Sequence, residues 1–124
     1  MLAGLDIGTT GCKCTVYNNQ GEFVNQAYRE YEDNDSEHQL NLELVWEKVL
    51  TILKEAVQNI DRLDAIGVSS FGESFVLLDE NDKVLMDSML YTDPRGKKQC
   101  SKIIKRFGNE YLNQSTGLKA NPMY

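Results

Sequence analysis

The sequence has little of several features that mark particular classes of protein. No apolar run approaches the ~20 residues of a membrane span, and no basic segment followed by a long apolar core opens the chain. Acidic residues outnumber basic ones by 19 to 13, and the formal net charge of −6 argues against a nucleic-acid partner. Three cysteines, an odd number, fit a reducing cytoplasm better than a disulfide framework. We therefore expect a cytoplasmic protein that binds neither membranes nor nucleic acids.

Metal-ligating side chains are equally sparse. The one histidine, His38, falls in a polar, acidic stretch over residues 30–39, and we assign it no role. Cys12 and Cys14 are two residues apart and would point to one face of a strand. With no second cysteine pair, we interpret them as buried thiols, with metal binding as the alternative. A length of 124 residues, 41% of them hydrophobic, corresponds to one domain or a piece of one.

The opening of the chain has the most informative pattern. A short apolar run contains Asp6 and leads into the turn Gly8-Thr9-Thr10-Gly11, after which apolar and polar residues alternate to residue 17. This pattern predicts strand, tight turn and strand. Glycines let a ligand approach the main chain, and turn amides and threonine hydroxyls can face an anion. A carboxylate beside a phosphate indicates a divalent cation between them, so the turn suggests Mg-nucleotide binding.

The same turn also has a purely structural explanation, as a β-hairpin whose loop happens to be rich in glycine and threonine. It is not a Walker loop, which needs a Gly-Lys-Ser/Thr ending before a helix. It is not a Rossmann fingerprint either, because the glycine spacing differs and a strand follows. From the residues alone, the hairpin and the phosphate-binding turn both remain open.

The middle of the chain predicts a third strand, a helix and a buried strand. Residues 22–31 favour an antiparallel strand, and apolar residues at helical spacing follow, with Asn41 as N-cap. We interpret this stripe, including Trp46, as core. Its members are Leu42, Val45, Trp46, Val49, Leu50, Leu53, Ala56, Val57 and Ile60. Residues 64–70 are nearly all apolar, which predicts a strand buried on both faces of a mixed sheet.

The last third predicts a hairpin around residues 80–83, a short strand over residues 89–91 and a second helix. Asp93-Pro94-Arg95 would open that helix, because Asp is favoured at the cap and Pro at the first position. Gly108 would end it. Asp93 is thus either only a helix cap or a residue that contacts substrate.

Four segments, taken in order, resemble the FGGY family of carbohydrate kinases. They are the opening turn, residues 67–73 (Gly-Val-Ser-Ser-Phe-Gly-Glu), residues 91–95 (Tyr-Thr-Asp-Pro-Arg) and the Thr-Gly…Pro segment at residues 116–124. The resemblance implies an α/β fold: a ribonuclease H-like (actin/hexokinase-type ATPase) domain with a mixed sheet and flanking helices. Residues 1–124 would be the N-terminal part of the first of two such domains. The rest of the first domain and the whole second domain would be absent.

The resemblance also implies roles for particular residues. It assigns the metal to Asp6, the ATP phosphates to Gly8, Thr9 and Thr10, and the substrate to Glu73, Asp93 and Arg95. Gly72 stands where some members have Arg, and Tyr91 where the aromatic residue is usually Trp, so the identity of the sugar stays open. The catalytic base is expected later than Tyr124, and the 124-residue chain alone is predicted to be inactive.

The implied activity is transfer of the γ-phosphoryl group of MgATP to a hydroxyl of a sugar, polyol or aldonate. ATP and Mg²⁺ would be the cofactors and a small carbohydrate the partner. Two alternatives remain. A non-catalytic sugar or nucleotide sensor would share the fold, and an actin/Hsp70-like ATPase would share the turn. Glu73 and Asp93-Pro94-Arg95 argue against the ATPase. Apolar surface left exposed in the incomplete domain would also allow a homodimer.

Overall fold

The protein is described here by a computed structural model of residues 1–32, 34, 38–72 and 74–123. A four-stranded sheet is built from β1 (Leu2–Ile7), β2 (Gly11–Tyr17), β3 (Phe23–Glu30) and β5 (Ala65–Ser70), in the order β3-β2-β1-β5. β2 is antiparallel to β1 and β3, whereas β5 is parallel to β1. The sheet is therefore mixed, and the predicted fold class is confirmed in this respect.

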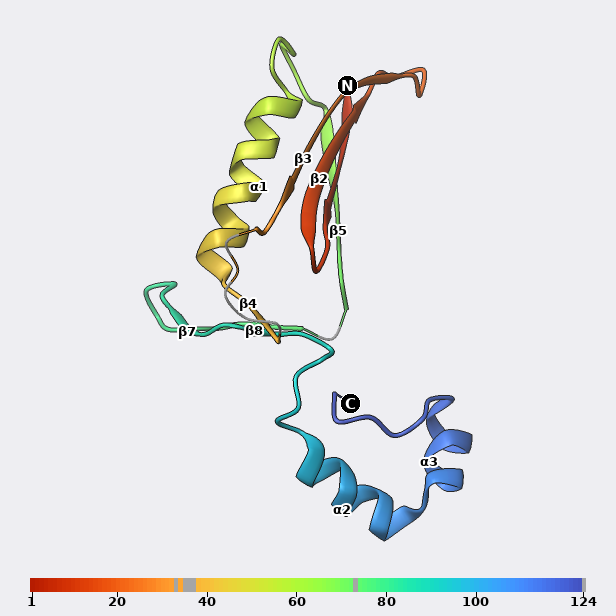
Figure 1. Cartoon of the computed structure of the whole chain (residues 1–124). Helices are drawn as coiled ribbons and strands as arrows, with labels where there is room; N and C mark the ends of the chain where they lie inside the picture. The colour runs from red at the N-terminus through yellow and green to blue at the C-terminus, as the bar shows by residue number, and fades with distance from the viewer. Residues whose placement is uncertain (33, 35–37, 73, 124) are drawn as a thin grey trace.

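Helix α1 (Leu42–Ala56) packs over β2 and β3 (Figure 1). Its predicted N-cap is confirmed, because the Asn41 side chain accepts a hydrogen bond of 3.0 Å from the Leu44 N–H. At the other end, the Asn25 side-chain amide donates to the carbonyls of Glu55 and Ala56 at 3.1 and 3.0 Å. These bonds satisfy carbonyls that a helix end leaves without an internal partner. The helix ends at Ala56, before the predicted limit at Ile60.

The core lies between α1 and one face of the sheet. From α1 it takes Val49, Ile52 and Ala56, of which the sequence stripe had omitted Ile52. The prediction that Trp46 and Leu50 are core is wrong, since 60% and 37% of these residues are exposed. Trp46 lies one turn before Val49, where the helix faces an open pocket that Phe71 also lines.

Cys12 and Cys14 are confirmed as buried free thiols on the α1 face of β2. Burial raises the pKa of both thiols, which keeps them protonated at neutral pH. Among the described residues, no cluster of three or more His, Cys, Asp or Glu side chains could hold a metal ion.

Strand β5 departs from its prediction. All six of its residues are exposed, with Ile66 at 46% and Val68 at 64%, so the expectation that it is buried on both faces is wrong. The physical reason is its position, because β5 is at the edge of the sheet and α1 covers β2 and β3 instead. An apolar run indicates that a strand can be buried. Whether it is buried depends on which other elements pack against it, and these cannot be read from the run itself.

Short strand pairs lie below the sheet in Figure 1. β4 (Gln39–Leu40) pairs with β8 (Ser88–Met89), and β6 (Leu77–Leu78) pairs with β7 (Val84–Met86). The second pair is the predicted hairpin, and the Asp79 side chain accepts hydrogen bonds from backbone N–H groups of its turn. The strand predicted over residues 89–91 occupies Ser88–Met89 instead.

Two helices, α2 (Lys97–Phe107) and α3 (Asn109–Thr116), follow the short strands and lie apart from the sheet. The prediction that Asp93 caps the first of them is wrong, because its N-cap is Gly96 and no side chain caps it. Gly108 does end α2, with a φ of 79°. The sequence had not predicted α3. No residue of either helix is buried, and no helix among the described residues is long and apolar enough to cross a membrane.

Candidate functional site

The turn between β1 and β2 is held at both ends by main-chain hydrogen bonds. The Gly8 N–H donates to the Gly11 carbonyl at 2.9 Å, and the Tyr31 N–H donates to the Thr10 carbonyl at 3.0 Å. Gly11 has to be glycine, because a Cβ there would overlap the backbone carbonyl of Arg29 on β3. The Thr9 and Thr10 N–H groups have no main-chain partner among the described residues. They are therefore available to an anion.

Tyr31, whose backbone supports this turn, is itself 6% exposed. Its hydroxyl has no hydrogen-bond partner among the described residues. Burial, and then the neighbouring Cys12, raise the pKa of this phenol, so it stays neutral.

Asp6 lies on the face of the sheet opposite α1, one residue before the end of β1. It is in register with Lys13 on β2 and Ser69 on β5. The carboxylate is exposed, and no hydrogen bond or ion pair to another described residue holds it. Mg²⁺ is commonly bound by one or two carboxylates together with phosphate oxygens and water, so a single free carboxylate close to a turn with free N–H groups is compatible with this ion.

Lys13 is a candidate that sequence reasoning missed. It lies directly across from Asp6 in the β1–β2 register and is exposed on the same face. A lysine ammonium near a phosphate-binding turn can neutralise part of the phosphate charge. The pairing of Ile7 with Cys12 across the turn already places Asp6 opposite Lys13, and this hairpin register was the signal that could have found it.

The Thr9 side of the turn opens onto a pocket of about 290 Å³, which we call the turn pocket. Its lining residues are Thr9, Phe71, Gly72, Ser74, Tyr91, Asn121 and Met123. Ser74 is positioned by donating its hydroxyl hydrogen to the Met89 carbonyl at 2.6 Å. The predicted substrate residue Glu73 lies outside the described residues, between two that line this pocket. The turn between β1 and β2 and the segment around Gly72 thus line one cavity.

A second pocket of about 320 Å³, the ion-pair pocket, contains Asp93 and Arg95. Its lining residues are Phe75, Met89, Leu90, Asp93, Arg95, Gly96, Gln99, Pro122 and Met123. Arg95 donates from Nε and Nη2 to the Asp93 carboxylate at 2.7–3.0 Å, and its backbone N–H donates at 2.9 Å. Hydrogen bonds from the Arg95 side chain and N–H, with its charge, hold the pKa of the Asp93 carboxyl below its usual range.

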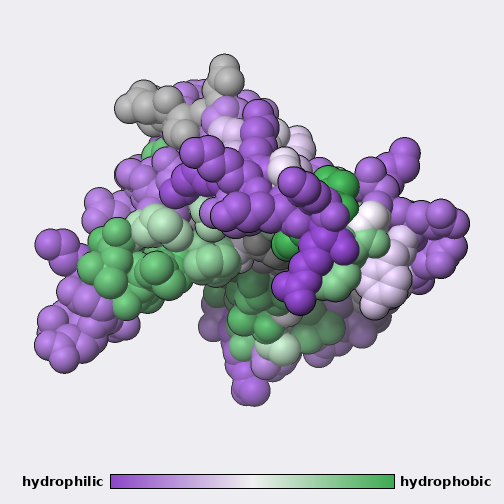
Figure 2. Space-filling view, turned by 90° about the horizontal axis from the view of Figure 1, so that it is seen from below, coloured by the Kyte–Doolittle hydropathy of each residue, from purple (hydrophilic) through white to green (hydrophobic). Residues whose placement is uncertain are grey.

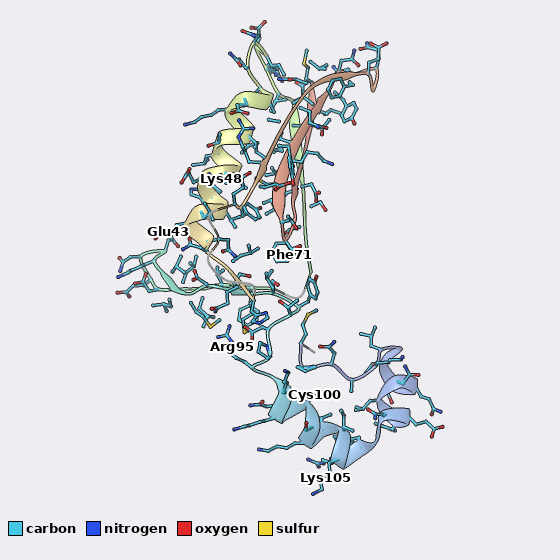
Figure 3. All side chains as sticks on the ribbon, viewed as in Figure 1. Glu43, Lys48, Phe71, Arg95, Cys100 and Lys105 are labelled. Atoms are coloured by element: carbon cyan, nitrogen blue, oxygen red, sulfur yellow. The ribbon has the colours of Figure 1, made fainter. Side chains whose placement is uncertain are left out.

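The two pockets are neighbours, since Met123 lines both. Figure 3 places Phe71 at the end of the sheet, Arg95 below it on the connection to α2, and Cys100 on α2. The structure therefore brings Thr9 together with the segment around Gly72. It places Asp93 and Arg95 next to that cavity, and Asp6 on the nearby sheet face. Sequence reasoning had not assigned Asn121 and Met123 to the site, because only the fold returns them to it.

Comparison with known proteins identifies the family. The whole chain, residues 1–124, matches the FGGY family of carbohydrate kinases, N-terminal domain. The chain belongs to this family. Among curated members, a rhamnulokinase of Oceanobacillus iheyensis is 32% identical over 68% of this chain and 18% of its own length.

Solved structures of FGGY kinases have the same fold. Gluconate kinase from Lactobacillus acidophilus matches with a TM-score of 0.84 and 25% identity, over 98% of this chain and 26% of its own. Plasmodium falciparum glycerol kinase with ADP matches with a TM-score of 0.81 and 15% identity, over 100% of this chain and 27% of its own. The predicted actin/hexokinase-like ATPase fold is thus confirmed. The chain spans roughly a fifth to a quarter of the length of these relatives.

Proposed function

We propose that residues 1–124 form the N-terminal part of the first domain of an ATP-dependent carbohydrate kinase. The enzyme transfers the γ-phosphoryl group of MgATP to a hydroxyl of a sugar, polyol or aldonate. One observation carries this proposal: the turn pocket is lined both by Thr9 of the phosphate-binding turn and by Gly72 and Ser74 of the substrate segment. Phosphoryl transfer requires the phosphate and the acceptor hydroxyl to meet in one cavity.

On the phosphate side, the free N–H groups of Thr9 and Thr10 donate to phosphate oxygens in this proposal, and Lys13 adds a positive charge. Asp6 would hold Mg²⁺, and the ion, when bound, supplies neutralisation of the charge that develops on the transferring group. Gly8, which carries no side chain, would let the phosphate come close to the main chain. These roles are supported by two observations on the described residues. Among them, the Thr9 and Thr10 N–H groups have no main-chain partner, and Asp6 and Lys13 form no ion pair.

On the substrate side, Phe71 and Tyr91 offer apolar surfaces against carbon-bound hydrogens of a carbohydrate. Asn121 and Glu73 would bind hydroxyl groups. Asp93 and Arg95 form an ion pair with each other in the adjoining pocket. We propose that this pair provides a rigid polar surface next to the bound substrate. The base that accepts the hydroxyl proton comes, in this proposal, from a part of the enzyme outside residues 1–124.

The proposal is tested with the full-length protein, by measuring ATP consumption in the presence of pentuloses, polyols and aldonates. Consumption that depends on one of these compounds, with formation of its phosphate ester, supports a kinase. Binding of a sugar or of ATP without turnover would instead support a non-catalytic sensor. ATP hydrolysis that no carbohydrate stimulates would overturn the proposal.

Substitution of Asp6 gives a more specific test. Asp6→Asn should lower kcat on the order of a hundredfold or more, because the lost carboxylate acts on charge that develops in the transition state. The KM for the carbohydrate should change little. Asp61→Asn is the matched control, since it removes the same charge from the loop before β5, at the opposite end of the sheet. An equal loss of carbohydrate binding in Asp6→Asn would show that Asp6 is structural.

A further inference from the structure

Residues 121–123 form a wall that the two pockets share. Asn121 and Met123 line the turn pocket, and Pro122 and Met123 line the ion-pair pocket. These residues follow the last helix and come from a part of the chain remote in sequence from Thr9 and Tyr91. The contacts that hold residues 121–123 in place therefore also determine the shape of both pockets.

Local hydrogen bonds direct the chain back to the site after α3. Gly117 adopts the left-handed conformation with a φ of 74°, and its N–H donates to the Asn113 carbonyl at 2.8 Å. The Thr116 hydroxyl oxygen then accepts from the Leu118 N–H at 3.1 Å, and the Asn121 side chain accepts from the Met123 N–H at 3.0 Å. In Figure 1 the C-terminal segment accordingly returns to lie between the two helices and the short strands.

The returning segment meets the N-terminus of α2 at a single glycine. A Cβ on Gly96 would overlap the Pro122 carbonyl oxygen, and it would lie 3.0 Å from the carbonyl carbon and 3.4 Å from the Cα of the same residue. All three are backbone atoms, which cannot move aside as the end of a side chain can. Gly96 has φ −74° and ψ −4°, an ordinary helical conformation open to every residue. Glycine is therefore required here for space, not for backbone freedom.

We propose that Gly96 is a positioning residue for the substrate site. Because it lacks a side chain, Pro122 can lie directly against the start of α2, which seats residues 121–123 as the common wall of the two pockets. The role of Gly96 toward substrate rests on the function proposed above, whereas its contact with Pro122 does not. Figure 2, which views this end of the molecule, shows apolar residues gathered in patches with hydrophilic residues across them.

A different explanation for Gly96 has to be separated from this one. Gly96 is also the N-cap of α2, a position that tolerates glycine and favours serine more strongly. Gly96→Ser would therefore improve the cap while introducing a Cβ against Pro122. The capping explanation predicts that this variant is unchanged or stabilised. The positioning explanation predicts that residues 121–123 are displaced.

The test compares Gly96→Ser with the unmodified full-length protein, and uses Gly4→Ser as the control because a Cβ at Gly4 has no atom within 4 Å. Amide hydrogen exchange is followed by mass spectrometry in peptides covering residues 118–123. We expect exchange there to be several-fold faster in Gly96→Ser and unchanged in Gly4→Ser. Unchanged exchange in Gly96→Ser would overturn the proposal.

Steady-state kinetics supply the second readout. We expect a several-fold higher KM for the carbohydrate in Gly96→Ser, with the KM for ATP unchanged. Faster exchange together with an unchanged carbohydrate KM would overturn the role toward substrate. If the unmodified protein phosphorylates no carbohydrate, the proposed function fails, and the exchange measurement still decides whether Gly96 seats the segment.

Discussion

The sheet with α1 and the region from residue 71 onward are stabilised in different ways. Every buried apolar residue among those described lies between Ala3 and Ala56, whereas after Ala56 only Ser88 is buried. The first region is a packed layer with its own core. The second consists of the β6–β7 pair, the strand β8, which pairs with β4, and two exposed helices, with the local Asp93–Arg95 ion pair before α2.

The first region therefore supplies most of the buried core, and the second supplies most of the lining of the turn pocket. Most residues that line the turn pocket come from the second region, and the first contributes Thr9 from the end of its hairpin. Binding residues on loops that a rigid scaffold positions are a common arrangement in proteins. Substitutions in the core should therefore change the free energy of unfolding, and substitutions in the second region should mainly change substrate constants.

The largest effect is expected for Ile52→Ala. This side chain is fully buried, at 0% exposure, and its truncation should lower the free energy of unfolding by about 2–5 kcal/mol. The matched control is Ile103→Ala in α2, where 43% of the residue is exposed and the expected loss is about 1 kcal/mol or less. Urea unfolding of residues 1–124 measures both. Equal losses at the two positions would mean that the second region has a core of its own.

An intermediate effect is expected for Glu73→Gln, on substrate binding instead of stability. A hydrogen bond to a charged group contributes about 1.5–3 kcal/mol, which corresponds to a carbohydrate KM raised roughly ten- to a hundredfold. The KM for ATP and the unfolding midpoint should hardly change, and Glu80→Gln on the exposed hairpin turn should change neither constant. The measurement is steady-state kinetics of the full-length variants. A collapse of kcat at an unchanged KM would make Glu73 a catalytic group.

The smallest effect concerns pH. Because the pKa of Asp93 is lowered in the folded protein, its ion pair with Arg95 contributes fully at neutral pH. That contribution is lost as the pH falls through the lowered pKa, below the usual aspartate range. An NMR titration of the Asp93 carboxyl carbon should show this low pKa, and Arg95→Gln should return it toward the ordinary value. An ordinary pKa in the unmodified protein would argue that the pair does not persist in solution.

The parts of the fold that the sequence could predict are those determined by local patterns. Alternation predicted the first strands, spacing and Asn41 predicted α1, and Gly108 predicted the end of α2. The exposure of Trp46 and of β5 could not be predicted in this way, because it depends on which element covers which face. The short α3 was missed because few of its residues are apolar.

The candidate site shows the same division. The turn at Gly8, Thr9 and Thr10 was singled out from consecutive residues, and the structure connects it to the segment around Gly72 through one pocket. Asn121 and Met123 could not be assigned, because a left-handed glycine and a contact at Gly96 bring them there from a distance. The roles of all seven predicted site residues stay predictions: Asp6, Gly8, Thr9, Thr10, Glu73, Asp93 and Arg95.

The hydrogen bond from Tyr31 to the turn has a consequence for binding entropy. It ties the Thr10 carbonyl to the chain just after β3, while the Gly8–Gly11 bond closes the turn from within. The Thr9 and Thr10 N–H groups are therefore oriented before any phosphate arrives. A ligand that meets donors already in place does not spend binding free energy on ordering a loop. If the turn binds phosphate as proposed, part of the cost of ordering the binding site is thus met during folding, through the hydrogen bond from Tyr31.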